Sequence, residues 1–167
     1  MAVVSTITPP YADRRLALVE AAQDVVARGG LRGLTHRAVD AAAGLPEGSC
    51  SSYFRTRIAL LTALTRNVGH LLAEETLALA ERLREGEGLP EEEQLELSRS
   101  EVTALFTRLV ENPDLVLVQA ELALESRRQP SLRKELDPWR AQIRQIVTDM
   151  VAGAGRRDPE RRAQTLV

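Results

Sequence analysis

The sequence has almost no cysteine and no long apolar run, and both absences exclude whole classes of protein. Cys50 is the only cysteine, so the chain has neither an intrachain disulfide framework nor a zinc site built on several cysteines. No apolar run approaches the roughly 18 residues of a membrane span, and the N-terminus lacks the basic start and apolar middle of a secretory signal. We therefore expect a cytoplasmic protein that makes no contact with a membrane.

Signals for β-strands, internal repeats and catalytic sites are also missing. The β-branched residues mostly fall within helical phases. The two histidines, His36 and His70, are far apart in the sequence, and neither has a nearby cysteine or a paired carboxylate at ligand spacing. This pattern does not support metal or nucleophilic chemistry, and we predict a protein that is not an enzyme and needs no cofactor and no metal.

A basic charge excess is absent as well, since the formal net charge is -2. Taken alone, this value argues against nucleic acid, because DNA-binding proteins usually displace phosphate counterions with a basic face. The charge is uneven, however, because residues 1–60 carry seven arginines against five acids while the rest of the chain is acidic. The N-terminal third is therefore the only part that favours a polyanion.

Apolar residues at three- and four-residue spacing predict helices along most of the chain. The Gly29-Gly30 pair should end the first helix, and Thr35 and Thr56 should cap the second and the fourth. Pro46 fits the first turn of the third helix. The helix after Pro113 is apolar on nearly every side, which is typical of a central helix packed on several faces. The expected helices are 13–28, 36–43, 47–53, 57–84, 91–111, one that opens at Asp114, a single kinked helix through Pro138 after Pro130, and a last one that begins at Asp158.

The segment 34–61 has the outline of a helix-turn-helix DNA reader. Its first helix would lie across the DNA backbone while the second enters the major groove, and Gly44 allows the tight angle between them. A short connection in a plain helical bundle could give the same spacing. The composition favours DNA, because the helix 47–53 is rich in serine and has almost no large apolar residue before Tyr53. On this helix Cys50 is either a thiol switch or a buried bystander thiol.

Between residues 13 and 64 the sequence has particular residue types at many fixed spacings. These residues are Leu18, Ala21, Ala22, Val26, Gly30, Thr35, Val39, Ala42, Ala43, Gly44, Leu45, Gly48, Ser49, Tyr53, Phe54, Ala59, Leu60 and Leu61. In this pattern the sequence resembles the tetracycline-repressor-like (TetR) family of bacterial transcriptional regulators. The resemblance implies an all-α fold, in which a three-helix DNA-binding domain, residues 12–58, is joined by a long fourth helix to a helical ligand-binding and dimerisation domain, residues 59–167.

The resemblance also implies which residues meet DNA. Thr35, His36 and Tyr53 are expected to touch phosphates, with Arg37 and Arg57 adding positive charge. Phe54 and Val39 are expected in the core. The residues expected to face the major groove are Glu47, Gly48, Ser49, Ser51 and Ser52.

Three positions depart from the family pattern. Pro46 stands where the family often has a capping serine, Glu47 where a basic residue is common, and Ser51 where an aromatic residue is common. The operator sequence is therefore not transferable from the family, and the grip on phosphates should be weaker than usual.

The second domain is expected to hold a small-molecule effector in a cavity between its helices. For the aromatic and methionine side chains proposed to line it, ordinary core packing is the alternative. The proposed lining residues are His70, Phe106, Gln119, Trp139 and Met150.

Together, these features predict a ligand-responsive transcriptional regulator, specifically a repressor that binds a palindromic DNA operator as a homodimer. The long fourth helix would carry the signal from the effector to the reader. The alternative is a helical ligand-binding or interaction module that has lost DNA binding. The family usually dimerises through two C-terminal helices, and only the first ten residues of such a helix, 158–167, are present, which predicts a truncated and largely monomeric fragment.

Overall fold

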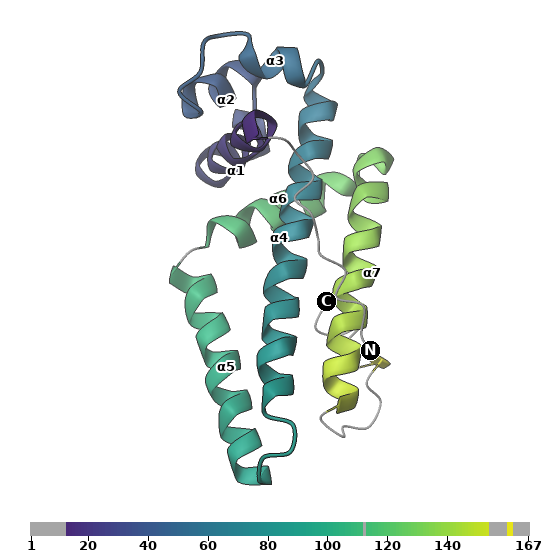
Figure 1. Cartoon of the computed structure of the whole chain (residues 1–167). Helices are drawn as coiled ribbons and strands as arrows, with labels where there is room; N and C mark the ends of the chain where they lie inside the picture. The colour runs from purple at the N-terminus through teal and green to yellow at the C-terminus, as the bar shows by residue number, and fades with distance from the viewer. Residues whose placement is uncertain (1–12, 112, 154–159, 162–167) are drawn as a thin grey trace. The chain divides into compact units, whose positions relative to one another are not determined.

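A computed structural model describes residues 13–111, 113–153 and 160–161 of the chain. These residues form seven helices and no strand, so the predicted all-α fold is confirmed (Figure 1). Within the described part, no helix is long and apolar enough to cross a membrane. The helices are α1 (Asp13–Gly33), α2 (His36–Ala42), α3 (Ser49–Tyr53), α4 (Arg57–Glu85), α5 (Glu91–Glu111), α6 (Asp114–Ser126) and α7 (Pro130–Gly153).

The chain divides into two compact units, and both α4 and α7 contribute to each of them. The first unit comprises residues 1–70 and 114–136, and the second comprises residues 71–113 and 137–167. The units thus do not follow a single cut in the sequence. The proposed functional boundary between residues 58 and 59 stays a prediction.

Local capping explains where the helices of the first unit begin and end. The Thr35 hydroxyl accepts a hydrogen bond from the Ala38 amide, and the Thr56 hydroxyl accepts one from the Ala59 amide, each over 3.1 Å. Both predicted N-caps are therefore confirmed. Gly30 has a φ of 64° and breaks α1 as expected, although a further short helical stretch carries the element on to Gly33.

The core of the first unit lies between α1, the start of α4 and α6. Leu18, Ala22 and Val26, at helical spacing on α1, are all buried. From α4 come Leu60, Leu61, Leu64 and Val68, and from α6 and α7 come Val118, Leu122, Leu132 and Leu136. This core supports α2 and α3, because α1 packs against both α6 and α2.

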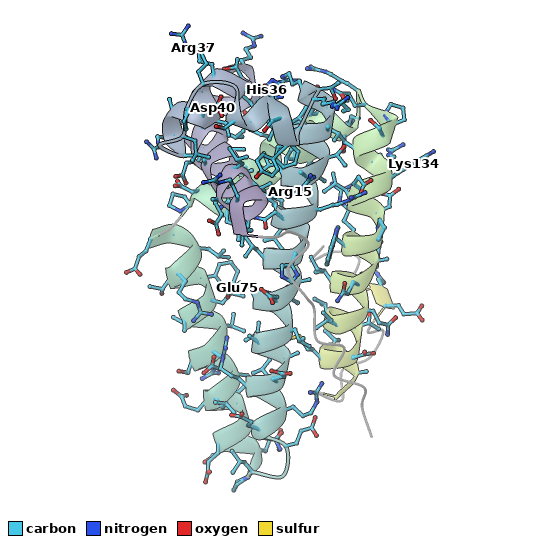
Figure 2. All side chains as sticks on the ribbon, turned by 45° about the horizontal axis from the view of Figure 1, so that its top comes forward. Arg15, His36, Arg37, Asp40, Glu75 and Lys134 are labelled. Atoms are coloured by element: carbon cyan, nitrogen blue, oxygen red, sulfur yellow. The ribbon has the colours of Figure 1, made fainter. Side chains whose placement is uncertain are left out.

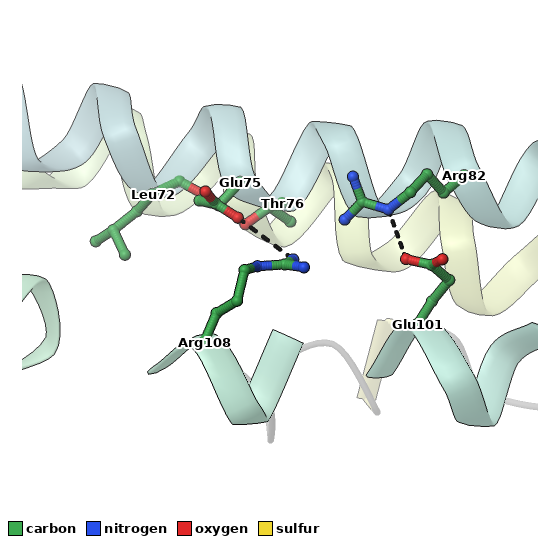
Figure 3. A network of polar contacts seen from close by, with 6 residues as sticks. All are labelled: Leu72, Glu75, Thr76, Arg82, Glu101 and Arg108. Carbon is green, nitrogen blue, oxygen red and sulfur yellow. Dashed lines mark hydrogen bonds and ion pairs between the residues drawn. The ribbon is translucent and has the colours of Figure 1, made fainter. Parts of the chain in front are cut away.

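The second unit consists of the end of α4, α5 and most of α7. Figure 3 shows two ion pairs that join α4 to α5, namely Arg82 with Glu101 at 2.5 Å and Arg108 with Glu75 at 3.7 Å. The whole of α5 is described, and none of its residues is buried. Its apolar side chains Leu95, Val102, Phe106 and Val110 are instead exposed.

Three sequence predictions about the helices need comment. α6 is not packed on several faces, because Val116, Leu117 and Leu124 are exposed, so that prediction was wrong. The prediction of one helix running through Pro138 is confirmed. The proposed start of a last helix at Asp158 lies outside the described residues, although Glu160 and Arg161 are helical.

Candidate nucleic-acid interface

The α2–α3 connection forms a tight turn through a glycine-based helix ending. Gly44 has a φ of 63°, and its amide donates to the Ala41 carbonyl over 3.2 Å. The Leu45 amide donates to the Asp40 carbonyl over 2.9 Å. This pair of bonds is the Schellman arrangement, which needs a left-handed residue just after the helix. Gly44 therefore sets the angle at which the chain leaves α2, as the helix-turn-helix prediction required.

Helix α3 begins at Ser49, two residues later than the sequence predicted. Gly48 has a φ of 95° and a ψ of -11°, which a continuous α-helix cannot contain. These angles fit the third residue of a type II turn, and the Ser49 amide donates to the Pro46 carbonyl over 3.1 Å. Pro46 and Glu47 therefore lie in a turn before α3, and the expectation that they open the helix was wrong.

The buried residues beneath α2 and α3 are those expected. Val39 is fully buried, and Phe54 is 1% exposed. The Arg15 guanidinium lies 4.7 Å from the centre of the Phe54 ring, and Arg15 also donates to the Tyr53 carbonyl over 3.5 Å. A cation above an aromatic face is attracted to it, so Arg15 helps to hold the end of α3 against α1.

Most of the proposed DNA-contacting residues lie at the start of α2 and along the turn and α3, while Arg57 begins α4. Figure 2 shows His36 and Arg37 on α2, with Arg37 extending away from the protein. His36 and Ser49 are half-buried, while the others are exposed. The exposed ones are Thr35, Arg37, Glu47, Gly48, Ser51, Ser52, Tyr53 and Arg57.

The three serine hydroxyls on α3 all donate to backbone carbonyls one turn back. Ser49 donates to Pro46 over 2.7 Å, Ser51 to Gly48 over 2.9 Å, and Ser52 to Ser49 over 2.7 Å. A hydroxyl that donates internally still has lone pairs that can accept. In this arrangement the serine hydroxyls can accept hydrogen bonds from donor groups on the base edges. To donate a hydrogen bond to a phosphate, a hydroxyl must first rotate away from its backbone carbonyl.

Glu47 is paired with a basic residue of the same surface. Its carboxylate lies 3.9 Å from Arg37 Nε, and both side chains are largely exposed. The acid at position 47 therefore offsets part of the positive charge that Arg37 brings to this surface. An exposed pair at this distance is weak and can be exchanged for other partners.

Arg57, a proposed DNA contact, forms a hydrogen bond to the backbone of α1. Its Nη2 donates to the Leu31 carbonyl over 2.7 Å. The Leu31 amide donates in turn to the Glu121 carboxylate on α6, over 3.2 Å. The peptide groups of one buried residue of α1 are thus bonded to both α4 and α6. A role for Arg57 in contacting DNA stays a prediction.

Sequence reasoning missed Asp40, which is on α2, is 2% exposed and accepts hydrogen bonds from the beginning of α3. Its Oδ2 accepts from the Gly48 amide over 2.8 Å, and its Oδ1 accepts from the Cys50 amide over 2.6 Å. An acid among the alanines of a short helix was the available signal. Its partners lie eight and ten residues away, beyond any local capping rule.

Cys50 is fully buried beneath α3. Burial and, to a lesser extent, the Asp40 carboxylate raise the pKa of its thiol from 9.0 to about 11. Because the thiolate is the reactive form, a raised pKa keeps this thiol inert near neutral pH. The structure therefore favours the bystander thiol over the thiol switch.

The residues proposed to line a ligand cavity are divided between the two units. His70 is buried on α4 and Gln119 is exposed on α6, both in the first unit. In the second unit, Phe106 is exposed on α5, and Trp139 and Met150 are half-buried on α7. Met150 borders a small cavity of about 130 Å³, together with Ala80, Leu83, Leu97 and Asp149.

Among the residues that the structure describes, no group of three or more histidine, cysteine and acidic side chains could hold a metal ion. His36 lies on α2 and His70 on α4.

Comparison with known proteins places the chain among regulators. Residues 95–167 match the family described as the tetracyclin repressor-like C-terminal domain. No curated protein matches the chain.

Solved structures resemble the chain over most of its length. The multidrug binding protein EbrR complexed with imidazole is 26% identical, covers 93% of this chain and 81% of its own, and has a TM-score of 0.63. EbrR also matches in its complexes with proflavin and ethidium. A transcriptional regulator from Rhodococcus sp. Rha1 is 25% identical, with 93% and 78% covered and a TM-score of 0.66. A TetR-family member from Streptomyces coelicolor A3 is 26% identical, with 93% and 81% covered and a TM-score of 0.60.

The two lines of similarity are complementary in position. The sequence pattern that resembles the family lies in residues 13–64, whereas the matched C-terminal domain begins at residue 95. The full-length structural neighbours include both parts. The chain therefore contains a tetracyclin repressor-like C-terminal region and resembles regulators of the tetracycline-repressor-like (TetR) family over most of its length.

Proposed function

We propose that this regulator is a ligand-responsive repressor that binds a palindromic DNA operator through α2 and α3. The observation that carries the proposal is the exposed polar surface of α3, where Ser51, Ser52 and Tyr53 lie above a fully buried Cys50 and Phe54. A five-residue helix with this polarity contributes little to a core. Its exposed serines are small enough to approach base edges closely.

In this proposal, phosphate contacts fix the register and groove contacts read the sequence. Thr35, His36 and Arg37 at the start of α2, with Tyr53 at the end of α3, hold the backbone. Glu47, Gly48, Ser49, Ser51 and Ser52 face the bases. Glu47 could accept a hydrogen bond from a cytosine amino group, which would give specificity at the cost of repulsion from the backbone. Such a protein should bind DNA with a modest salt dependence.

We also propose that a small organic molecule regulates DNA binding. EbrR, the relative described above, is a multidrug binding protein that was solved with imidazole, proflavin and ethidium. In this chain α4 contributes residues to both compact units, so a ligand in the second unit could act on the first through one continuous helix. The proposed lining residues in the second unit are Phe106, Trp139 and Met150, with the cavity beside Met150 as the starting point.

A paired substitution tests the DNA surface. We expect the Ser49→Ala, Tyr53→Ala double variant to lose binding to the duplex upstream of its own gene, with the helix content unchanged by circular dichroism. The matched control is Ser100→Ala, which removes an exposed serine from α5 and should bind like wild type. Full binding by the double variant would disprove the site assignment.

The competing function is a helical ligand-binding or interaction module without DNA binding. It is favoured by the Glu47–Arg37 pair, which reduces the positive charge of the surface. Titrating the wild-type protein with the same duplex at several salt concentrations separates the two. A module of this kind should show no salt-dependent affinity.

Homodimerisation is part of the proposal, because a palindromic operator presents two half-sites related by a two-fold axis. Two linked readers gain effective concentration that a single reader lacks. Sedimentation of the protein with and without the duplex measures this. One protomer per duplex at saturation would contradict the palindromic operator.

A further inference from the structure

We propose that Asp40 is a positioning residue that sets the place of the reading helix α3 relative to α2. The DNA part of this inference rests on the proposed function, while the structural part does not. Asp40 is on α2, yet both of its carboxylate oxygens are used at the beginning of α3. They accept from the Gly48 amide at 2.8 Å and the Cys50 amide at 2.6 Å.

The sequence of α3 provides no side-chain cap of its own. Gly48, which has no side chain, occupies the N-cap position. Pro46, two residues earlier, has no hydroxyl to offer where the family often has a capping serine. A helix of five residues leaves most of its amides without intrahelical partners. The Asp40 carboxylate therefore replaces a local cap by one supplied from the neighbouring helix.

Asp40 also holds the other end of the connection. Its backbone carbonyl accepts from the Leu45 amide over 2.9 Å and closes the Schellman turn that ends α2. One residue thus bonds to the chain at positions 45, 48 and 50, through its backbone and its side chain. The connection has little freedom to change its length or angle while these three bonds are intact.

The burial of Asp40 makes the arrangement specific. A carboxylate that is 2% exposed is stable only with hydrogen-bond donors in place, so α3 cannot shift without leaving this group unsatisfied. The phosphate-contacting residues are proposed on α2 and the groove-facing residues on α3. Their separation is therefore fixed by the Asp40 carboxylate, which would itself touch no DNA.

Amide hydrogen exchange gives the structural test, because it needs no ligand. The Ser52 amide is bonded to the Gly48 carbonyl, and the Phe54 amide to the Cys50 carbonyl. In Asp40→Ala we expect both to exchange roughly tenfold faster or more, as for the loss of a strong cap. The Val39 amide, bonded to the Thr35 carbonyl in α2, should keep its rate. In Asp40→Asn, which keeps one acceptor oxygen, the two exchange rates should lie between those of wild type and of Asp40→Ala. This variant provides the test if Asp40→Ala does not fold.

Val39→Ala is the matched control, because Val39 is the buried neighbour of Asp40 on the same helix. It should lower the melting temperature but accelerate exchange in α2 and α3 together. If Asp40→Ala behaves in the same way, or leaves Ser52 and Phe54 protected, Asp40 has only a general structural role and the inference is wrong.

The same variants are then titrated with the duplex upstream of the gene. We expect wild type, Asp40→Asn and Asp40→Ala to bind in that order of decreasing affinity, with Asp40→Ala at least tenfold weaker than wild type. Equal affinity despite faster exchange in α3 would overturn the positioning role. If wild type itself does not bind, the proposed function fails, and the exchange results decide separately whether Asp40 fixes α3.

Discussion

The two compact units of this protein are built in contrasting ways. The first unit contains a continuous apolar core that reaches from α1 through α4 to α6. In the second unit, the buried apolar side chains among the described residues are Ala73, Leu79 and Ala80, all from α4. The first unit is thus held together by apolar burial, whereas in the second unit ion pairs join α4 to α5.

This difference matches what the proposed function requires of each unit. A DNA reader needs fixed distances between contacts, and close packing provides them because a core tolerates little rearrangement. A ligand-responsive half must instead rearrange at low cost. Surface ion pairs are individually weak and easily re-formed, so they set the alignment of two helices without making it rigid.

The largest expected effect is on the free energy of unfolding when a phenylalanine is replaced in each of the two units. Phe54→Ala should lower the free energy of unfolding by about 3–5 kcal/mol, because it removes a ring that is 1% exposed. Phe106→Ala, where the ring is 62% exposed, should change it by less than about 0.5 kcal/mol. Chemical denaturation of both variants measures the difference. Similar losses would mean that α5 is covered in solution and that the contrast between the units is false.

A second prediction concerns pH and the buried thiol of the first unit. The unfolded Cys50 thiol ionises near pH 9.0 and the folded one near 11, so the unfolded state binds fewer protons between these values. The free energy of unfolding should therefore be intact below pH 9.0 and fall as the pH rises towards 11, by up to ~2 kcal/mol.

Cys50→Ala should remove this part of the alkaline loss, which denaturation at about pH 8 and about pH 10 would measure against wild type. The difference between the two proteins is the relevant quantity, because it removes the contributions that the two proteins share. Parallel pH profiles would indicate that water reaches the thiol and that the core beneath α3 is not dry.

The smallest expected effects are the ion-pair couplings. Arg66 and Glu135 form a pair in the first unit at 2.5 Å, and Arg82 and Glu101 form one in the second at the same distance. Double-mutant cycles should give about 0.2–1 kcal/mol for each pair, and less at high salt. A coupling of about 3 kcal/mol for Arg82 with Glu101 would be typical of a buried pair, and the second unit would then be as rigid as the first.

Local sequence rules predicted the features of the fold that depend on local interactions. The bounds of α5 were predicted correctly, because Pro90 and Pro113 lie just outside its ends. The N-caps Thr35 and Thr56 were predicted correctly because each hydroxyl accepts a hydrogen bond from an amide only three residues away. The helix-turn-helix outline followed from Gly44, whose left-handed conformation few other residues adopt easily.

The failures have a different physical origin. The start of α3 was misplaced because the amides of its N-cap Gly48 and of Cys50 are satisfied by Asp40 from another helix. The exposure of α6 was missed because its composition shows which side chains favour burial, but not how much neighbouring surface is there to cover Leu117 or Leu124. For the DNA surface, the sequence predicted a group of residues most of which lie on α2, the turn and α3, and their contacts with DNA stay predictions.

The bonds at Leu31 have a consequence for how this protein can evolve. Its amide bonds to Glu121 of α6 and its carbonyl to Arg57 of α4, so the connection uses the main chain. A change of side chain at position 31 leaves both bonds possible, provided that the apolar space is filled. The side chains that the connection between α1, α4 and α6 requires are therefore those of Arg57 and Glu121. Position 31, between them, can accept other apolar residues during evolution.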